Sequence, residues 1–163
     1  MQDRLVRVEW SSAPVNRPEN HLTGVSFRRG AGHWAPGGTA PWTTFSWTTR
    51  FADHWAFEDT GLADGDSFGQ GTVGYETDTA DIHDQDGVPR VTGQDGTPPS
   101  FVVLATADLS EWRNVGQGGA ATMGTLRAPG GGIVFTAPTT GWGYGLANGD
   151  PTIDQITATS SST

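Results

Sequence analysis

The sequence contains no cysteine and no lysine, and it has few aliphatic residues for its length. Without cysteine there is no disulfide framework, thiol nucleophile or thiolate metal site. No stretch approaches the roughly 18 consecutive apolar residues of a membrane span, and the first residues lack the apolar core of a signal peptide. All nine basic residues are Arg and form no basic stripe, so nucleic-acid binding is not expected. We therefore expect a soluble, cytoplasmic protein without a membrane segment.

The composition lies near the boundary between folded and disordered chains. Leu, Ile, Val and Phe make up 29 of the 163 residues, which is below the roughly 20% that marks a highly charged chain as disordered. Seven Trp add large buriable surface, and short apolar runs are interleaved with the polar residues. The length suits one domain. We predict a single folded domain over residues 1–158, poor in core residues, and a disordered tail over residues 159–163.

The net charge of −9 comes from one segment. Between Asp53 and Asp95 there are eleven acidic residues against the single Arg90, while the rest of the chain is close to neutral. Charge runs of this kind usually face solvent, so we favour a solvated acidic loop. A loose calcium site in this segment stays open, because calcium accepts flexible sets of oxygen ligands. Its candidate ligands are Asp64, Asp66, Asp84 and Asp86.

Short apolar segments predict strands joined by turn-rich loops. Residues 101–105 form a continuous apolar run, which is typical of a strand covered on both faces. Residues 122–127 and 132–136 flank an Ala-Pro-Gly-Gly sequence that predicts a hairpin turn. Further strands are predicted over residues 5–10, 23–28, 44–50 and 73–77.

Helix signals are few. Asp150 is a helix N-cap residue followed by Pro151 at the first helical position, and residues 78–99 are expected to be a long loop. The fold class is therefore predicted as α/β or α+β, with a β-dominated mixed sheet and few short helices.

His54 is the histidine of most chemical interest, because Asp53 precedes it and Glu58 follows four residues later. A His with two carboxylates within reach can act as a general base. A loop His that caps backbone groups is the simpler interpretation, and we favour it. The Gly-x-Ser-x-Gly sequence over residues 65–69 lacks the flanking strand and helix of a nucleophile elbow, so it predicts only a glycine-rich loop.

The seven Trp allow a carbohydrate-stacking surface as a second hypothesis. A chain with so few aliphatic residues must, however, use aromatic side chains in its core. We therefore expect at least four of the seven Trp to be core residues.

Several stretches resemble one family in order and spacing. They are Asp53-His-Trp-Ala-Phe-Glu-Asp-Thr-Gly-Leu62, Asp64-Gly-Asp-Ser-Phe-Gly69, Val73-Gly-Tyr-Glu-Thr-Asp78, Gly96-Thr-Pro-Pro-Ser-Phe-Val-Val-Leu104 and Asp150-Pro-Thr-Ile-Asp-Gln-Ile-Thr157. Over nearly its whole length, the chain resembles the C-terminal region of proteins similar to the large (beta) subunit of N,N-dimethylformamidase. Two departures stand out: Arg127 replaces an acid of the family's dimethylformamidases, and the last residues lose the apolar face of the family's final helix.

The resemblance implies a fold and a chemistry. The family's large subunits carry an α/β region like that of class I glutamine amidotransferases, and this chain would be its C-terminal end. The namesake enzyme hydrolyses a small N-alkylated amide to an amine and formate, using a mononuclear iron held by tyrosines and a glutamate. Those ligands are expected upstream of this segment. Iron is therefore assigned to the full-length family, and no cofactor is assigned to this chain, whose tyrosines, Tyr75 and Tyr144, match no ligand motif.

The resemblance also selects catalytic candidates. Glu76 and Asp78 match a Gly-Tyr-Glu-x-Asp stretch of the family, and His54 matches a His-Trp stretch of closer relatives. We expect a C-terminal domain of a dimethylformamidase-like amidohydrolase that needs an upstream portion or a partner subunit, and whose isolated chain is inactive on linear amides. The alternative is a non-catalytic β-rich module that binds carbohydrate or calcium. An interaction surface that docks onto the rest of a complex, and an oligomer, also stay open.

Overall fold

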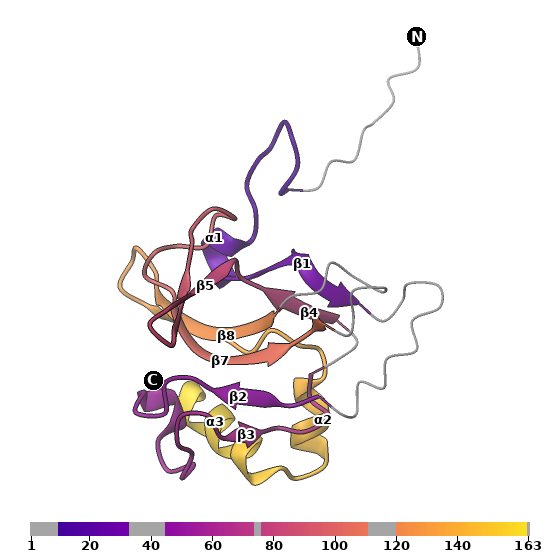
Figure 1. The fold of residues 1–163 in the computed structure, drawn as a ribbon, viewed down its shortest axis with the longest axis vertical. Coiled ribbons are helices and arrows are strands. Elements are labelled where there is room, and N and C mark those ends of the chain that lie inside the picture. The colour runs from indigo at the N-terminus through magenta and orange to yellow at the C-terminus, as the bar shows by residue number, and fades with distance from the viewer. Residues whose placement is uncertain (1–9, 33–44, 74–75, 111–119, 163) are drawn as a thin grey trace.

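The computed structural model describes residues 10–32, 45–73, 76–110 and 120–162 (Figure 1). The strands in these ranges are β1 (Ser26–Gly32), β2 (Trp47–Thr49), β3 (Ser67–Phe68), β4 (Glu76–Thr79), β5 (Ile82–Gln85), β6 (Val88–Val91), β7 (Val102–Asp108), β8 (Ala120–Arg127) and β9 (Ile133–Thr136). The helices are α1 (Asn20–Thr23), the 3-10 helix η2 (Trp55–Phe57), α2 (Trp142–Ala147) and α3 (Pro151–Ser161).

The prediction of a β-dominated fold with few short helices is confirmed, but the prediction of a mixed sheet is wrong for the part of the chain described. Every strand pair there is antiparallel. The strands form one five-stranded sheet and two two-stranded sheets. The likeness to a glutamine amidotransferase and the domain bounds stay predictions.

The central sheet has the strand order β3-β2-β7-β8-β9, with β7 in the middle. Residues 103–107 of β7 are buried, so the predicted strand with two covered faces is confirmed. Figure 1 shows α2 and α3 beside β2 and β3, and β1 and β4 beside β8 at the opposite end of the view. The sheet therefore separates a helical layer from a second, smaller sheet.

Two hydrophobic cores lie on the two sides of the central sheet. The first core contains Trp47 of β2 and Leu104 of β7, against which Ile153 of α3 packs. The second core contains Phe101 and Val103 together with Val25 just before β1, Ala80 just after β4 and Leu126 of β8. Because one strand contributes to both cores, a chain with few aliphatic residues can still build two layers.

Phe101 joins helix α1 to the central sheet. A Cβ atom added to Gly24, at the end of α1, or to Gly124, in β8, would overlap the ring of Phe101. The ring thus occupies the space that side chains at both positions would need. Gly24 also has a φ of +83°, which favours glycine at a helix C-terminus.

The prediction of a long loop over residues 78–99 is wrong, because strands β5 and β6 lie within this range. They form an antiparallel hairpin whose two turn residues, Asp86 and Gly87, both have positive φ, as in a type I′ turn. Ile82 and Val91 anchor the hairpin against the second core. The other hairpin turn, predicted between β8 and β9, is confirmed by backbone hydrogen bonds between residues 128 and 132.

The predicted start of the last helix is confirmed. Oδ1 of Asp150 accepts the backbone N–H groups of Thr152 and Ile153 at 2.9 and 3.0 Å. The helix continues to Ser161, so residues 159–161 are helical where the sequence predicts a disordered tail. Trp10, the last residue of the strand predicted over 5–10, lies in a turn, and residues 5–9 lie outside the described ranges.

Replacing Gly124 with Ala should lower the free energy of unfolding by about 2–3 kcal/mol, because the new methyl group would overlap the Phe101 ring and the carbonyl oxygen of Val102. Gly130→Ala is the matched control, since no atom lies within 4 Å of its added Cβ. Urea denaturation of both variants checks this. Equal losses of stability would contradict the packing described for Phe101.

Candidate functional site

His54 begins helix η2 and contacts strand β8. Its Nδ1 accepts the backbone N–H of Ala56 at 3.2 Å, which caps η2, and its Nε2 lies 3.5 Å from Oγ1 of Thr125. Because Nδ1 is the acceptor, the proton of the neutral ring is on Nε2 and points toward Thr125. Burial lowers the pKa of His54 from its ordinary value of 6.5, so the ring is neutral at pH 7. The interpretation of His54 as a capping residue is confirmed.

The carboxylates predicted beside His54 are not assembled around it. Asp53 and Glu58 are exposed, and in the described ranges neither makes a hydrogen bond or ion pair with the ring. The neighbours of His54 are aromatic instead, with the ring centroids of Phe51 and Trp55 at 5.6 and 5.1 Å. A general-base role for His54 therefore stays a prediction without a carboxylate partner among the described residues.

Three carboxylates influence one another near strand β4. Glu76 and Asp78 are alternate residues of β4, and both are half-buried. Burial, reinforced by the negative charges of Glu19 and Glu76, raises the pKa of Asp78 from 3.8 to about 6. Glu19 precedes α1 and accepts the hydroxyl of buried Ser26. Asp78 can therefore exchange a proton close to neutral pH.

Sequence reasoning selected Glu76 and Asp78 but missed Glu19. No local signal marks Glu19, because the fold alone brings α1 near β4 through the pairing of β1 with β4.

The first two calcium candidates hold a turn. Oδ1 of Asp64 accepts the backbone N–H of Ala52 at 2.6 Å, and Oδ2 of Asp66 accepts that of Ala63 at 2.8 Å. This turn leads into β3, so the prediction of a glycine-rich loop over residues 65–69 holds for the turn at Gly65 and Asp66, whereas Ser67 and Phe68 form a short strand. Both carboxylates satisfy backbone donors that the tight turn leaves unpaired.

The other two calcium candidates belong to the β5–β6 hairpin. Oδ1 of Asp84 accepts the backbone N–H of Gly87 at 2.9 Å, and Asp86 occupies the turn itself. Across the described ranges, no three His, Asp or Glu side chains are placed to hold a metal ion. The described residues therefore give no support to the calcium alternative.

A buried polar network ties α1 to the loop after β6. Asn20 is 1% exposed, and its Nδ2 donates to Oδ2 of Asp95 at 3.2 Å and to Oγ1 of Thr97 at 3.0 Å. Asp95 also accepts the backbone N–H groups of Asp81 and Thr97. Asp95 is thus a structural hub, although the sequence groups it with the solvated acidic segment.

Most described Trp residues serve the core. Trp47 is fully buried, Trp55 and Trp142 pack against the same core, and Trp47 and Trp142 each donate the indole N–H to a threonine hydroxyl. Trp10 is 69% exposed. The remaining Trp residues outside the described ranges are Trp34, Trp42 and Trp112. The described part of the chain thus gives no cluster of exposed Trp for stacking on sugars.

These features define a β-rich domain whose described polar side chains mostly hold loops and helix ends. A family model described as "N,N-dimethylformamidase beta subunit-like, C-terminal" matches residues 2–155. The chain belongs to this family, and the resemblance inferred from its motifs is confirmed. No curated protein and no solved structure matches it. Among the described residues, no helix combines the length and apolar character needed to cross a bilayer.

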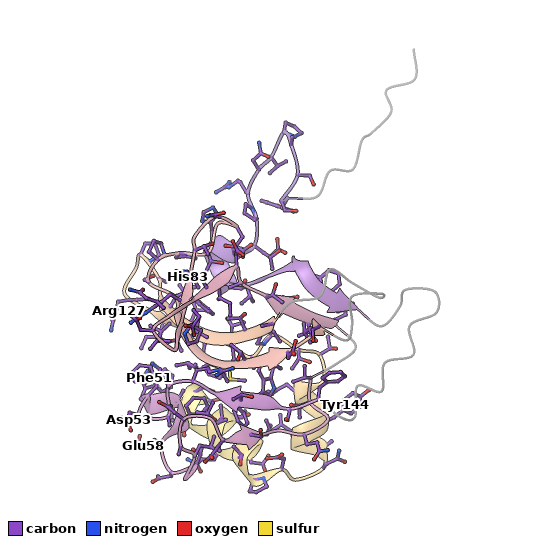
Figure 2. The ribbon with its side chains drawn as sticks, in the orientation of Figure 1. Phe51, Asp53, Glu58, His83, Arg127 and Tyr144 are labelled. Carbon is purple, nitrogen blue, oxygen red and sulfur yellow. The ribbon has the colours of Figure 1, made fainter. Side chains whose placement is uncertain are left out.

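The described residues do not supply the ligands that the resemblance implies for iron. Tyr144 lies on α2 with 51% of its surface exposed, and Tyr75 lies outside the described ranges. Figure 2 shows Tyr144 on the opposite side of the molecule from Asp53 and Glu58. The tyrosines and the glutamate of such a ligand set are therefore not brought together in the part of the chain described.

Replacing His54 with Ala should lower the free energy of unfolding by about 1 kcal/mol, because the Ala56 N–H loses its acceptor. His54→Asn keeps an acceptor and should retain most of that stability. The lowered pKa of folded His54 means that the unfolded state binds more protons, so the contribution of His54 is lost as pH falls below about 6.5. Urea denaturation at pH 7.5 and 5.5 measures both effects. An Asn variant as unstable as the Ala variant would contradict the cap.

Replacing Asp78 with Asn should raise the free energy of unfolding at pH 7 by about 1–2 kcal/mol, because the negative charge of Asp78 is costly in the folded state. Solvent screening of this half-buried group keeps the gain small. The pKa of Asp78 is about 6 in the folded state and ordinarily 3.8, so the folded state binds more protons in that interval. Wild-type stability should therefore fall as pH rises from about 4 to about 6, and the variant should lose this slope.

Guanidinium denaturation across this pH interval checks the effect of Asp78. Glu76→Gln is the control, because removing one of the neighbouring charges should move the midpoint of Asp78 to lower pH without abolishing the slope. A slope unchanged in the Asp78→Asn variant would show that another group causes it.

Proposed function

We propose that the chain acts as the C-terminal domain of an N,N-dimethylformamidase-like amide hydrolase, and that most reacting groups come from another portion or a partner subunit. The observation that carries this proposal is the family match over residues 2–155. The family description itself refers to a C-terminal part of beta-subunit-like proteins.

Several candidate residues have structural roles, which supports a domain that depends on another portion or subunit for catalysis. His54 caps η2, while Asp64, Asp66 and Asp84 accept backbone N–H groups in turns. A general base must reach the proton that it removes with a free lone pair. The lone pair of His54 is engaged by a backbone N–H, so the ring is better suited to holding its loop than to taking a proton.

Asp78 is the described residue that we assign to proton transfer if this domain contributes to the reaction. Amide hydrolysis requires water to lose a proton as it adds to the carbonyl carbon, and the amine nitrogen to gain one as the C–N bond breaks. A carboxyl group with a pKa of about 6 can take and return such a proton near neutral pH. Polarising the carbonyl requires a further electrophile, which we assign to the other portion or the partner subunit.

The isolated chain is expected to release no formate from N,N-dimethylformamide, either free of metal or loaded with ferrous iron. The assay measures formate after prolonged incubation, and far-UV circular dichroism with Trp fluorescence confirms that the chain is folded. Formate release that depends on iron, from this chain alone, would overturn the proposal.

A further inference from the structure

The face of the central sheet that carries the first core has an uncovered end. Val102 of β7 pairs with Thr125 of β8, and Arg127 of β8 pairs with Ile133 of β9. Paired residues project to the same side of a sheet, and so do residues two apart in one strand. Thr125 is buried, whereas Val102 and Ile133 are 38% and 42% exposed.

Phe51 extends this uncovered end on the side of β2. Phe51 is 42% exposed, and its ring contacts His54, which in turn contacts Thr125. We name Phe51, Val102 and Ile133 the end strip. It is a line of apolar side chains around buried Thr125, and the described part of the chain leaves it open to solvent.

The charges beside the end strip are arranged with opposite signs on its two sides. Figure 2 shows Arg127 on one side of Phe51, and Asp53 and Glu58 on the other. Arg127 donates to the carbonyl of Gly131 at 3.4 Å, and it forms no ion pair within the described ranges. The strip therefore has a positive edge, an apolar centre and a negative edge.

This arrangement is self-complementary. When two identical surfaces meet around a twofold axis that lies in the interface and runs perpendicular to the line joining the two edges, each edge of one copy faces the opposite edge of the other. The positive edge would then meet the negative edge twice, and the apolar centres would bury each other. A surface with charges of a single sign would repel its own copy instead.

We propose that the end strip binds the end strip of a second copy of this chain, with Arg127 of each copy against Asp53 and Glu58 of the other. The self-complementary charges select this occupant over an unrelated protein, whose surface need not carry the same pattern. The proposal does not depend on amide hydrolysis, so the formate assay and the test below can fail separately.

Sedimentation equilibrium of the full chain over a wide concentration range tests the proposal. We expect the average mass to rise toward twice the mass of the chain as concentration increases. Val102→Arg should weaken the dimer at least about tenfold, because it places a charge in the apolar centre. Val88→Arg is the matched control: Val88 is 45% exposed on the β5–β6 hairpin, and the variant should dimerise like wild type.

Charge reversal tests the orientation of the two copies. Arg127→Glu should weaken the dimer about tenfold by placing like charges together. Adding Asp53→Arg and Glu58→Arg to the same chain should restore dimerisation, since both edges are then exchanged. Circular dichroism and thermal unfolding show whether each variant is folded.

A chain that stays monomeric at all concentrations overturns the proposal, as does a dimer that resists Val102→Arg. Equal weakening by Val88→Arg would show an unspecific effect and would also overturn it. Failure of the triple charge exchange to restore a dimer lost in Arg127→Glu would overturn the proposed orientation.

Discussion

The burial of strand β7 on both faces is the constraint on which the rest of this structure depends. Leu104 contributes to the core under α3, while Val103 and the preceding Phe101 contribute to the core that includes the residues flanking β1 and β4. A composition with few aliphatic residues cannot fill two independent cores, so both layers rely on the same strand. The close fit of Phe101 to two glycines extends this dependence to α1. The layers that carry His54 and Asp78 therefore pack on the two faces of β7.

The acidic segment has a largely structural role. Asp64, Asp66 and Asp84 satisfy backbone donors in tight turns, and Asp95 anchors the buried Asn20. Asp78 differs, because burial and neighbouring carboxylates make its negative charge costly. The fold thus uses several acidic side chains to shape loops, while Asp78 titrates near neutral pH.

Local signals predicted the features that depend on neighbours in sequence. The apolar run of β7, the Asp150 helix cap and the hairpin turn before β9 each have their cause within a few residues. The β5–β6 hairpin was missed because its polar residues resemble a loop, and only Ile82 and Val91 anchor it to a core built by distant strands. The environment of Asp78 was equally inaccessible, since Glu19 reaches it only through the folded chain.

Native-state hydrogen exchange, followed residue by residue with NMR, tests the central role of β7 most directly. Amides that open only on global unfolding exchange most slowly, whereas segments that open locally exchange faster. We expect the slowest exchange in the amides that pair β7 with β8, and faster exchange in the β5–β6 hairpin and the β1–β4 sheet. Protection of the β5–β6 amides equal to or greater than that of β7 would contradict this expectation.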